Sequence, residues 1–125
     1  MRFPGITVGQ KNTVERVVSY DHTAGSFGIS SYEKLLTTPA MVALMMYASK
    51  ELVDSHLPED FISVGKQADV THEQPCVEGA HIRLTVEITG FDGYHVELGM
   101  RAEDDTGLIG TGRHVRTIVD RKSVV

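Results

Sequence analysis

The apolar residues that follow Thr37 are spaced as on an α-helix. One stripe, at intervals of three and four residues, consists of Met41, Leu44, Met45, Ala48 and Leu52. A second stripe consists of Val42, Met46 and Val53, so almost no polar face remains. The pattern predicts a helix from about Pro39 to about His56, ended by Pro58 and surrounded by protein.

The start of this helix is marked by a threonine directly before a proline. Threonine is favoured at the N-cap and proline at the first helical position, so we expect Thr38 to cap the helix before Pro39. The N-terminal amides and dipole of a helix also stabilise negative charge on a carbonyl oxygen. Thr38 is therefore a candidate for binding such an oxygen as well as a cap.

The rest of the chain predicts β-strands. Apolar and polar residues alternate between Ile82 and Thr89, as in an antiparallel strand with one buried face, and Asp92-Gly93 is a hairpin signal. The segment Tyr20–Leu36 is interpreted as a loop with a short helical turn at Tyr32–Leu36. The predicted strands are Lys11–Ser19 at an edge, Ser63–Glu73, Ile82–Thr89, Val96–Glu103 and Leu108–Val119.

This order of elements predicts an α+β fold. A strand, one long apolar helix and then antiparallel strands pack most compactly as one twisted sheet wrapped around the helix. The 125 residues suffice for a single domain, residues 1–125. A single sheet with open edges also predicts self-association, as a homodimer or a dimer of dimers.

Composition and charge exclude several classes of function. The net charge is −5 and no basic run occurs, which argues against nucleic acid as a partner. No apolar stretch approaches the roughly 20 residues that span a bilayer, and Met1–Gly5 is too short for a signal peptide, so no membrane partner is expected. The single cysteine, Cys76, permits no internal disulfide and fits a cytoplasmic protein.

The candidate for acid–base chemistry is His72. In a strand without a bulge, Val64, Ala68, Val70 and His72 share one face, which we expect to point at the helix. His72 is then either a general base or a histidine satisfied within the core. No metal site is expected, because His72-Glu73 lacks a second histidine four residues on and the other histidines show no ligand spacing.

The glycines of the last strand are interpreted structurally. The segment Gly107–Gly112 precedes no helix, so it is not a dinucleotide-binding fingerprint. Gly110 and Gly112 instead indicate a bulge or the close approach of another group, either a ligand or a second subunit.

Three segments together resemble the hot-dog-fold thioesterases, and within them the fluoroacetyl-CoA thioesterase type. They are the helix Thr38–Ala48, the strand end Val70-Thr71-His72 with Pro75 and Gly79, and Gly110–Arg116. The likeness extends from about Leu35 to Val119. It implies a sheet around a central helix, dimers with active sites at the interface, and a substrate in which coenzyme A carries the acyl group, with no other cofactor.

The resemblance also implies roles for individual residues. The family has a threonine at the helix start, a glutamate two turns further and a histidine on the next strand. These positions fall on Thr38, Met46 and His72. Methionine is neither a nucleophile nor a base, so the family's carboxylate is missing. The expected substrate-binding residues are Met41, Met45, Met46 and Gly65.

Three interpretations follow. The first is a thioesterase for a small acyl-CoA, in which His72 positions and deprotonates water while Thr38 and the helix amides hold the carbonyl oxygen. The second is a non-catalytic acyl-CoA-binding protein on the same scaffold, because Met46 replaces the glutamate. The third is an unrelated structural module, in which Thr38 is only a cap and His72 only a core residue. The sequence identifies neither the acyl group nor what replaces the glutamate.

Overall fold

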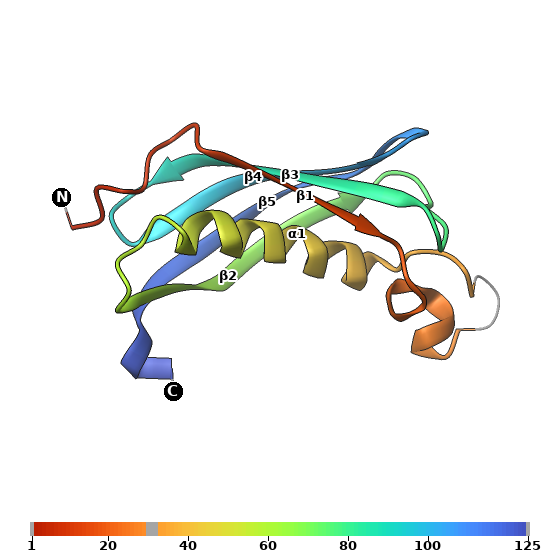
Figure 1. Cartoon of the computed structure of the whole chain (residues 1–125), viewed down its shortest axis with the longest axis horizontal. Coiled ribbons are helices and arrows are strands. Elements are labelled where there is room, and N and C mark those ends of the chain that lie inside the picture. The colour runs from red at the N-terminus through yellow and green to blue at the C-terminus, as the bar shows by residue number, and fades with distance from the viewer. Residues whose placement is uncertain (1, 30–32, 125) are drawn as a thin grey trace.

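One antiparallel sheet and one long helix make up the fold in the computed structural model, which describes residues 2–29 and 33–124. The helix is α1 (Thr38–Asp54), and the strands are β1 (Lys11–Val17), β2 (Phe61–His72), β3 (His81–Phe91), β4 (His95–Asp104) and β5 (Gly107–Asp120). The strand order is β1-β3-β4-β5-β2, so β1 and β2 are the edges. α1 lies along one face of this sheet (Figure 1). The expected α+β class is confirmed, as is the wrapping of the sheet around the helix.

The helix begins one residue earlier than the sequence predicts. Thr37 has the extended backbone of an N-cap (φ −79°, ψ 153°), and its side chain accepts a hydrogen bond from the Ala40 N–H. Thr38 is already helical, and Pro39 follows it in the first turn. The expectation that Thr38 caps the helix is therefore wrong. Because Thr37 takes the capping role, the Thr38 hydroxyl is available for another contact.

The core lies between α1 and the sheet. Met41, Met45, Ala48 and Val53 of the helix are fully buried against strand residues such as Leu84, Val86, Ile88 and Leu98. The opposite side of the helix is open, with Pro39 and Ala43 exposed and Tyr47 43% exposed. The expectation that the helix is surrounded on all sides is wrong for the single chain, because the sheet covers only one face.

The edge strand β2 contains a bulge that changes which residues share a face. Gly65 pairs with Arg116 and Gln67 with Val115, so Lys66 is an extra residue. Ser63 is buried and Gly65 faces Met46 of α1, which places Val64 on the outer face. Grouping Val64 with His72 was therefore wrong. His72 faces the helix as predicted, but it does so because of the bulge.

The two glycines in β5 make room for groups of the same chain. A Cβ on Gly110 would lie 2.6 Å from the sulfur of Met41 and 3.0 Å from the carbonyl oxygen of Thr71. A Cβ on Gly112 would lie 2.7 Å from the carbonyl oxygen of Asp69. Within this chain the groups that approach these glycines closely belong to the helix and to the neighbouring strand β2.

The segment before the helix has more structure than the predicted loop. It forms two 3₁₀ turns, η1 (Tyr20–His22) and η2 (Ala24–Phe27). Of the predicted helical turn at Tyr32–Leu36, Tyr32 lies outside the described residues, whereas Leu35 and Leu36 form isolated β-bridges rather than a helix. Across residues 2–29 and 33–124, none of the helices has the length and apolar character needed to cross a bilayer.

Candidate active site

The start of α1 and the end of β2 bring two predicted site residues together. Thr38 Oγ1 and His72 Nδ1 are 2.9 Å apart and share a hydrogen bond, although 34 residues separate them in sequence. This contact depends on two features that differ from the sequence-based predictions, the N-cap at Thr37 and the bulge in β2. The cap at Thr37 frees the Thr38 hydroxyl, and the bulge in β2 turns His72 toward the helix.

The second ring nitrogen of His72 has no partner within the described part of the chain. Nε2 is buried and makes no hydrogen bond there, and such an orphaned polar atom costs about 1–3 kcal/mol. When Nδ1–H donates to Thr38 Oγ1, Nε2 carries the lone pair and can accept a proton. The Thr38 hydroxyl is then free to donate to another oxygen. A histidine that is merely satisfied in the core does not leave a ring nitrogen unused.

Fewer amide groups of the first helical turn are free to bind a carbonyl oxygen than the sequence predicts. Pro39 has no N–H, and the Ala40 N–H is bound by the Thr37 side chain. The Met41 N–H donates to the Thr37 carbonyl oxygen. Of this turn, the donors left for an incoming carbonyl oxygen are those of Thr38, its N–H and its hydroxyl.

Met46 lies at a different level of the helix from Thr38. Met46 follows Thr38 by eight positions, which corresponds to about 12 Å along the axis. Met46 is half-buried, and its terminal methyl group would lie 2.8 Å from a Cβ on Gly65. A group at position 46 and a group at Thr38 of the same chain therefore cannot contact one small carbonyl together.

The carboxylates near the helix are occupied elsewhere. Glu51 accepts a hydrogen bond from the Tyr47 hydroxyl at 2.6 Å on the exposed side of α1. Asp54 accepts from both the amide and the hydroxyl of Ser63. Glu33 lines a separate hollow beside Tyr20. Over residues 2–29 and 33–124, none of these three carboxylates hydrogen-bonds to His72.

Beside Met46 lies a buried polar cluster that the sequence interpretation missed. Arg116 and His114, 4% and 1% exposed, face the helix from β5 and hydrogen-bond each other at 3.0 Å. Burial lowers the pKa of His114, and the charge of Arg116 lowers it further. Burial also lowers the pKa of Arg116, against the opposing effect of Asp54. A period-two count back from Arg116 through His114 to Gly112 and Gly110 could have placed both side chains on the helix face.

The methionines expected to bind substrate divide into two groups. Met41 and Met45 are fully buried members of the core, whereas Met46 is partly accessible and contacts the Gly65 position. The assignment of Met41, Met45, Met46 and Gly65 to substrate binding stays a prediction. Of the four, Met46 and Gly65 adjoin the cluster of His114 and Arg116.

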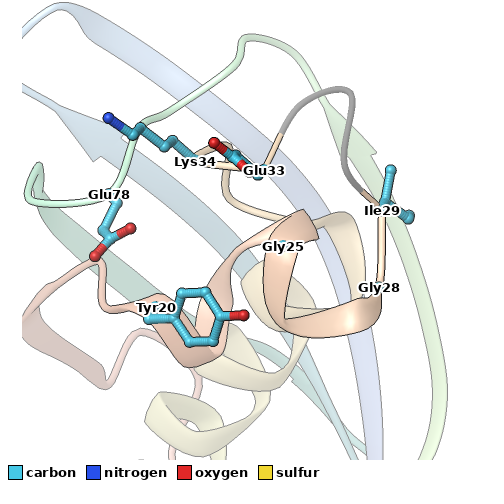
Figure 2. A pocket seen from close by; sticks show the side chains of 7 residues that line it. All are labelled: Tyr20, Gly25, Gly28, Ile29, Glu33, Lys34 and Glu78. Atoms are coloured by element: carbon cyan, nitrogen blue, oxygen red, sulfur yellow. The ribbon is translucent and has the colours of Figure 1, made fainter.

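Two hollows lie near the start of the helix. One is an apolar groove of about 480 Å³ on the open face of α1, and it is lined by Arg16, Asp21, His22, Phe27, Pro39, Ala40, Ala43, Leu44 and Tyr47. The other, of about 450 Å³, lies among the loops (Figure 2) and contains Tyr20, Glu33, Lys34 and Glu78. Two carboxylates against one ammonium group disfavour a phosphate in the second hollow. Neither hollow is lined by Thr38 or His72.

Metal ligands do not gather in this fold. Over the residues that the structure describes, no group of three or more histidine, cysteine, aspartate or glutamate side chains could hold a metal ion. Cys76 is buried, and desolvation raises the pKa of its thiol to about 11, which disfavours the nucleophilic thiolate.

The chain is similar to known proteins both in sequence and in fold. The model of the fluoroacetyl-CoA-specific thioesterase family matches residues 18–122. A search of curated proteins finds no match. Among solved structures, a hot-dog-like protein from Thermanaerovibrio acidaminovorans is 29% identical, with 96% of this chain and 88% of that chain covered and a TM-score of 0.89.

Two further structures share the fold at lower identity. One is a variant of the fluoroacetyl-CoA-specific thioesterase FlK in complex with fluoroacetate and CoA, at 24% identity, 96% and 100% coverage and a TM-score of 0.87. The other is a thioesterase superfamily member from Thermus thermophilus, at 23% identity, 95% and 88% coverage and a TM-score of 0.85. At these identities the likeness establishes the hot-dog fold alone.

Proposed function

Because the chain belongs to the fluoroacetyl-CoA-specific thioesterase family, we propose that it hydrolyses the thioester of a small acyl group and coenzyme A. The observation that carries this proposal is the pairing of Thr38 with His72, whose Nε2 is buried and unpartnered within the described residues. The fluoroacetyl specificity named for the family does not extend to this chain, because Met46 replaces the family's glutamate. The acyl group we propose is small and otherwise unspecified.

The proposed reaction uses His72 as the base. His72 Nε2 takes a proton from a water molecule as the water oxygen attacks the thioester carbonyl carbon. The Thr38 hydroxyl donates a hydrogen bond to the carbonyl oxygen, which becomes negative in the tetrahedral intermediate. When the carbon–sulfur bond breaks, the proton passes from His72 to the CoA thiolate. The products are a carboxylic acid and free CoA.

The proposed active form is a homodimer. The 12 Å along the helix between Thr38 and position 46 separates the two ends of the family's site within one chain. If two helices lie antiparallel across the subunit interface, position 46 of one chain approaches Thr38 and His72 of the other. The exposed apolar side of α1, with Ala43 and Tyr47, supplies surface for such packing.

The second candidate function is acyl-CoA binding without turnover, and the methionine at position 46 favours it. A panel of short-chain acyl-CoAs separates the two functions when thiol release is followed with a colour reagent. We expect release of CoA from at least one member. No release from any member, together with thermal stabilisation by CoA, would establish binding instead. If neither CoA release nor thermal stabilisation by CoA is observed, the result would favour a purely structural role.

Two adjacent threonines provide a matched test of the proposed carbonyl contact. Thr38→Ala is expected to lower kcat about tenfold, because it removes one hydrogen bond to the developing oxyanion, and to leave stability nearly unchanged. Thr37→Ala is expected to lower the free energy of unfolding by about 1 kcal/mol through loss of the cap while kcat persists. Urea unfolding and steady-state kinetics measure both. The reverse pattern would assign the carbonyl contact to Thr37 instead of Thr38.

A further inference from the structure

The bulge in β2 is held by two buried side chains of β5. We propose that His114 and Arg116 are positioning residues, which fix the extra residue Lys66 and thereby decide that His72 faces the helix. This proposal rests on the proposed function, because the base that they would position is the one assigned above. In this role neither residue touches the substrate.

The alternation of faces along β2 shows why the bulge matters. Ser63 and Gly65 face the helix, as the burial of Ser63 and the contact of Gly65 with Met46 show. In a regular strand every second residue would follow them inward, ending at Thr71, and His72 would point outward. Because Lys66 is extra, the inward positions shift by one residue, and His72 reaches the Thr38 hydroxyl instead.

The hydrogen bonds of the two side chains bracket the bulge. His114 Nδ1–H donates to the carbonyl oxygen of Gln67 at 2.8 Å, on one side of Lys66. Arg116 donates to the carbonyl oxygen and hydroxyl of Ser63, at 2.8 Å and 2.7 Å, on the other side. An N–H of Arg116 also donates to His114 Nε2 at 3.0 Å, which joins the two halves.

We call His114 and Arg116, with their hydrogen bonds to Gln67 and Ser63, the clamp. The neutral form of His114 is the one that this clamp requires. The imidazole both donates at Nδ1 and accepts at Nε2, and only its neutral form can do so. Burial and the neighbouring guanidinium lower its pKa and so favour that form. The positive charge of Arg116 is linked to the carboxylate of Asp54 through the Ser63 hydroxyl. This hydroxyl accepts a hydrogen bond from Arg116 and donates one to Asp54 at 2.6 Å.

Lys66, the extra residue of the bulge, is also bound on the outer face of the sheet. The Lys66 ammonium group lies 3.3 Å from His95 Nε2, and His95 Nδ1 lies 2.9 Å from Asp92. A one-residue slip of β2 would break the inner and outer contacts together. The slip would leave the buried side chains of His114 and Arg116 without their partners on β2, so these hydrogen bonds oppose it.

The test compares two substitutions of one residue. Glutamine at position 114 can donate to Gln67 and accept from Arg116, whereas phenylalanine of similar size can do neither. We expect His114→Phe to lower kcat at least tenfold and His114→Gln to remain within about threefold of the parent. The ¹⁵N NMR signals of the His72 ring report the hydrogen bond to Thr38. We expect them to change in His114→Phe and to persist in His114→Gln.

A second variant separates positioning from general destabilisation. Deleting Lys66 removes the extra residue, so the pairing of Gly65 with Arg116 and of His72 with Gly110 is reached by a regular strand. We expect this deletion, added to His114→Phe, to restore the parent signals of the His72 ring. A folding defect would not be repaired by removing one more residue.

The NMR signals also separate this proposal from the proposed function. If the parent protein hydrolyses no acyl-CoA but the His72 signals follow the expected pattern, the clamp stands and the enzymatic role falls. If His114→Phe is folded and keeps both the parent signals and the parent activity, the positioning role is refuted. It is equally refuted if the Lys66 deletion leaves the altered signals of His114→Phe unchanged.

Discussion

Replacement of His72 by alanine is expected to lower kcat by about 10²–10⁴-fold, the usual contribution of a general base. The variant loses the nitrogen that would accept the proton of the attacking water, and Thr38 loses its partner at 2.9 Å. Because the unpartnered Nε2 is already a cost to the folded state, we expect little loss of stability. Steady-state hydrolysis of the best substrate of the acyl-CoA panel measures the effect.

Two control variants sharpen this experiment. His72→Gln keeps an amide that can hydrogen-bond Thr38 but has no basic nitrogen, so it is expected to lose as much activity as alanine. His81→Ala removes an exposed histidine at the start of β3 and is expected to leave kcat unchanged. Full activity in His72→Ala would exclude His72 as the base. Full activity in His72→Gln alone would reduce its role to positioning the water.

Replacement of Met46 by glutamate is expected to raise kcat at least tenfold, because it supplies the carboxylate that the resemblance to the family implies at this position. The methyl group of Met46 and an Nη of Arg116 lie 2.8 Å and 3.8 Å from one point, the Cβ position of Gly65. A carboxylate at position 46 would therefore have a guanidinium nearby, which favours its ionised form. The measurement is kcat across the acyl-CoA panel, with Met46→Gln as the uncharged control.

A mixed dimer tests whether position 46 acts across the interface. A chain carrying both Met46→Glu and His72→Ala is combined with the parent chain. If the site is shared between subunits, one site of the mixed dimer has Glu from the first chain and His72 from the second, and the rate gain remains. Activity at or below the parent level would place position 46 and His72 in one chain. Equal rates for Met46→Glu and Met46→Gln would instead show that no carboxylate is needed.

The fold could be predicted from the sequence because its signals are local. The spacing of Met41, Met45 and Ala48 identifies a helix, and the alternation from Ile82 to Thr89 identifies a strand, since each reflects one buried face. The order of these elements then leaves few compact arrangements, and the structure confirms the sheet wrapped around the helix.

The site could be predicted only in part, because its geometry depends on residues far apart in the chain. Thr38 and His72 were both identified, but not the hydrogen bond between them, and the cap proved to be Thr37. From the sequence, His114 and Arg116 stand out only as members of the segment Gly110–Arg116. A period-two count along β5 indicates that both face the helix, but their hydrogen bonds to Gln67 and Ser63 depend on the pairing of β5 with β2.

By itself the sequence determined the helix and the alternating strands, and it identified a histidine and a threonine as candidate site residues. The tertiary structure decided which atoms of those residues meet. The N-cap is Thr37 rather than Thr38, which frees the Thr38 hydroxyl. One extra residue in β2 changes which face of the sheet each later side chain of that strand points to. Both depend on long-range contacts that compete with local preference, and such contacts exist only once helix and strands have packed.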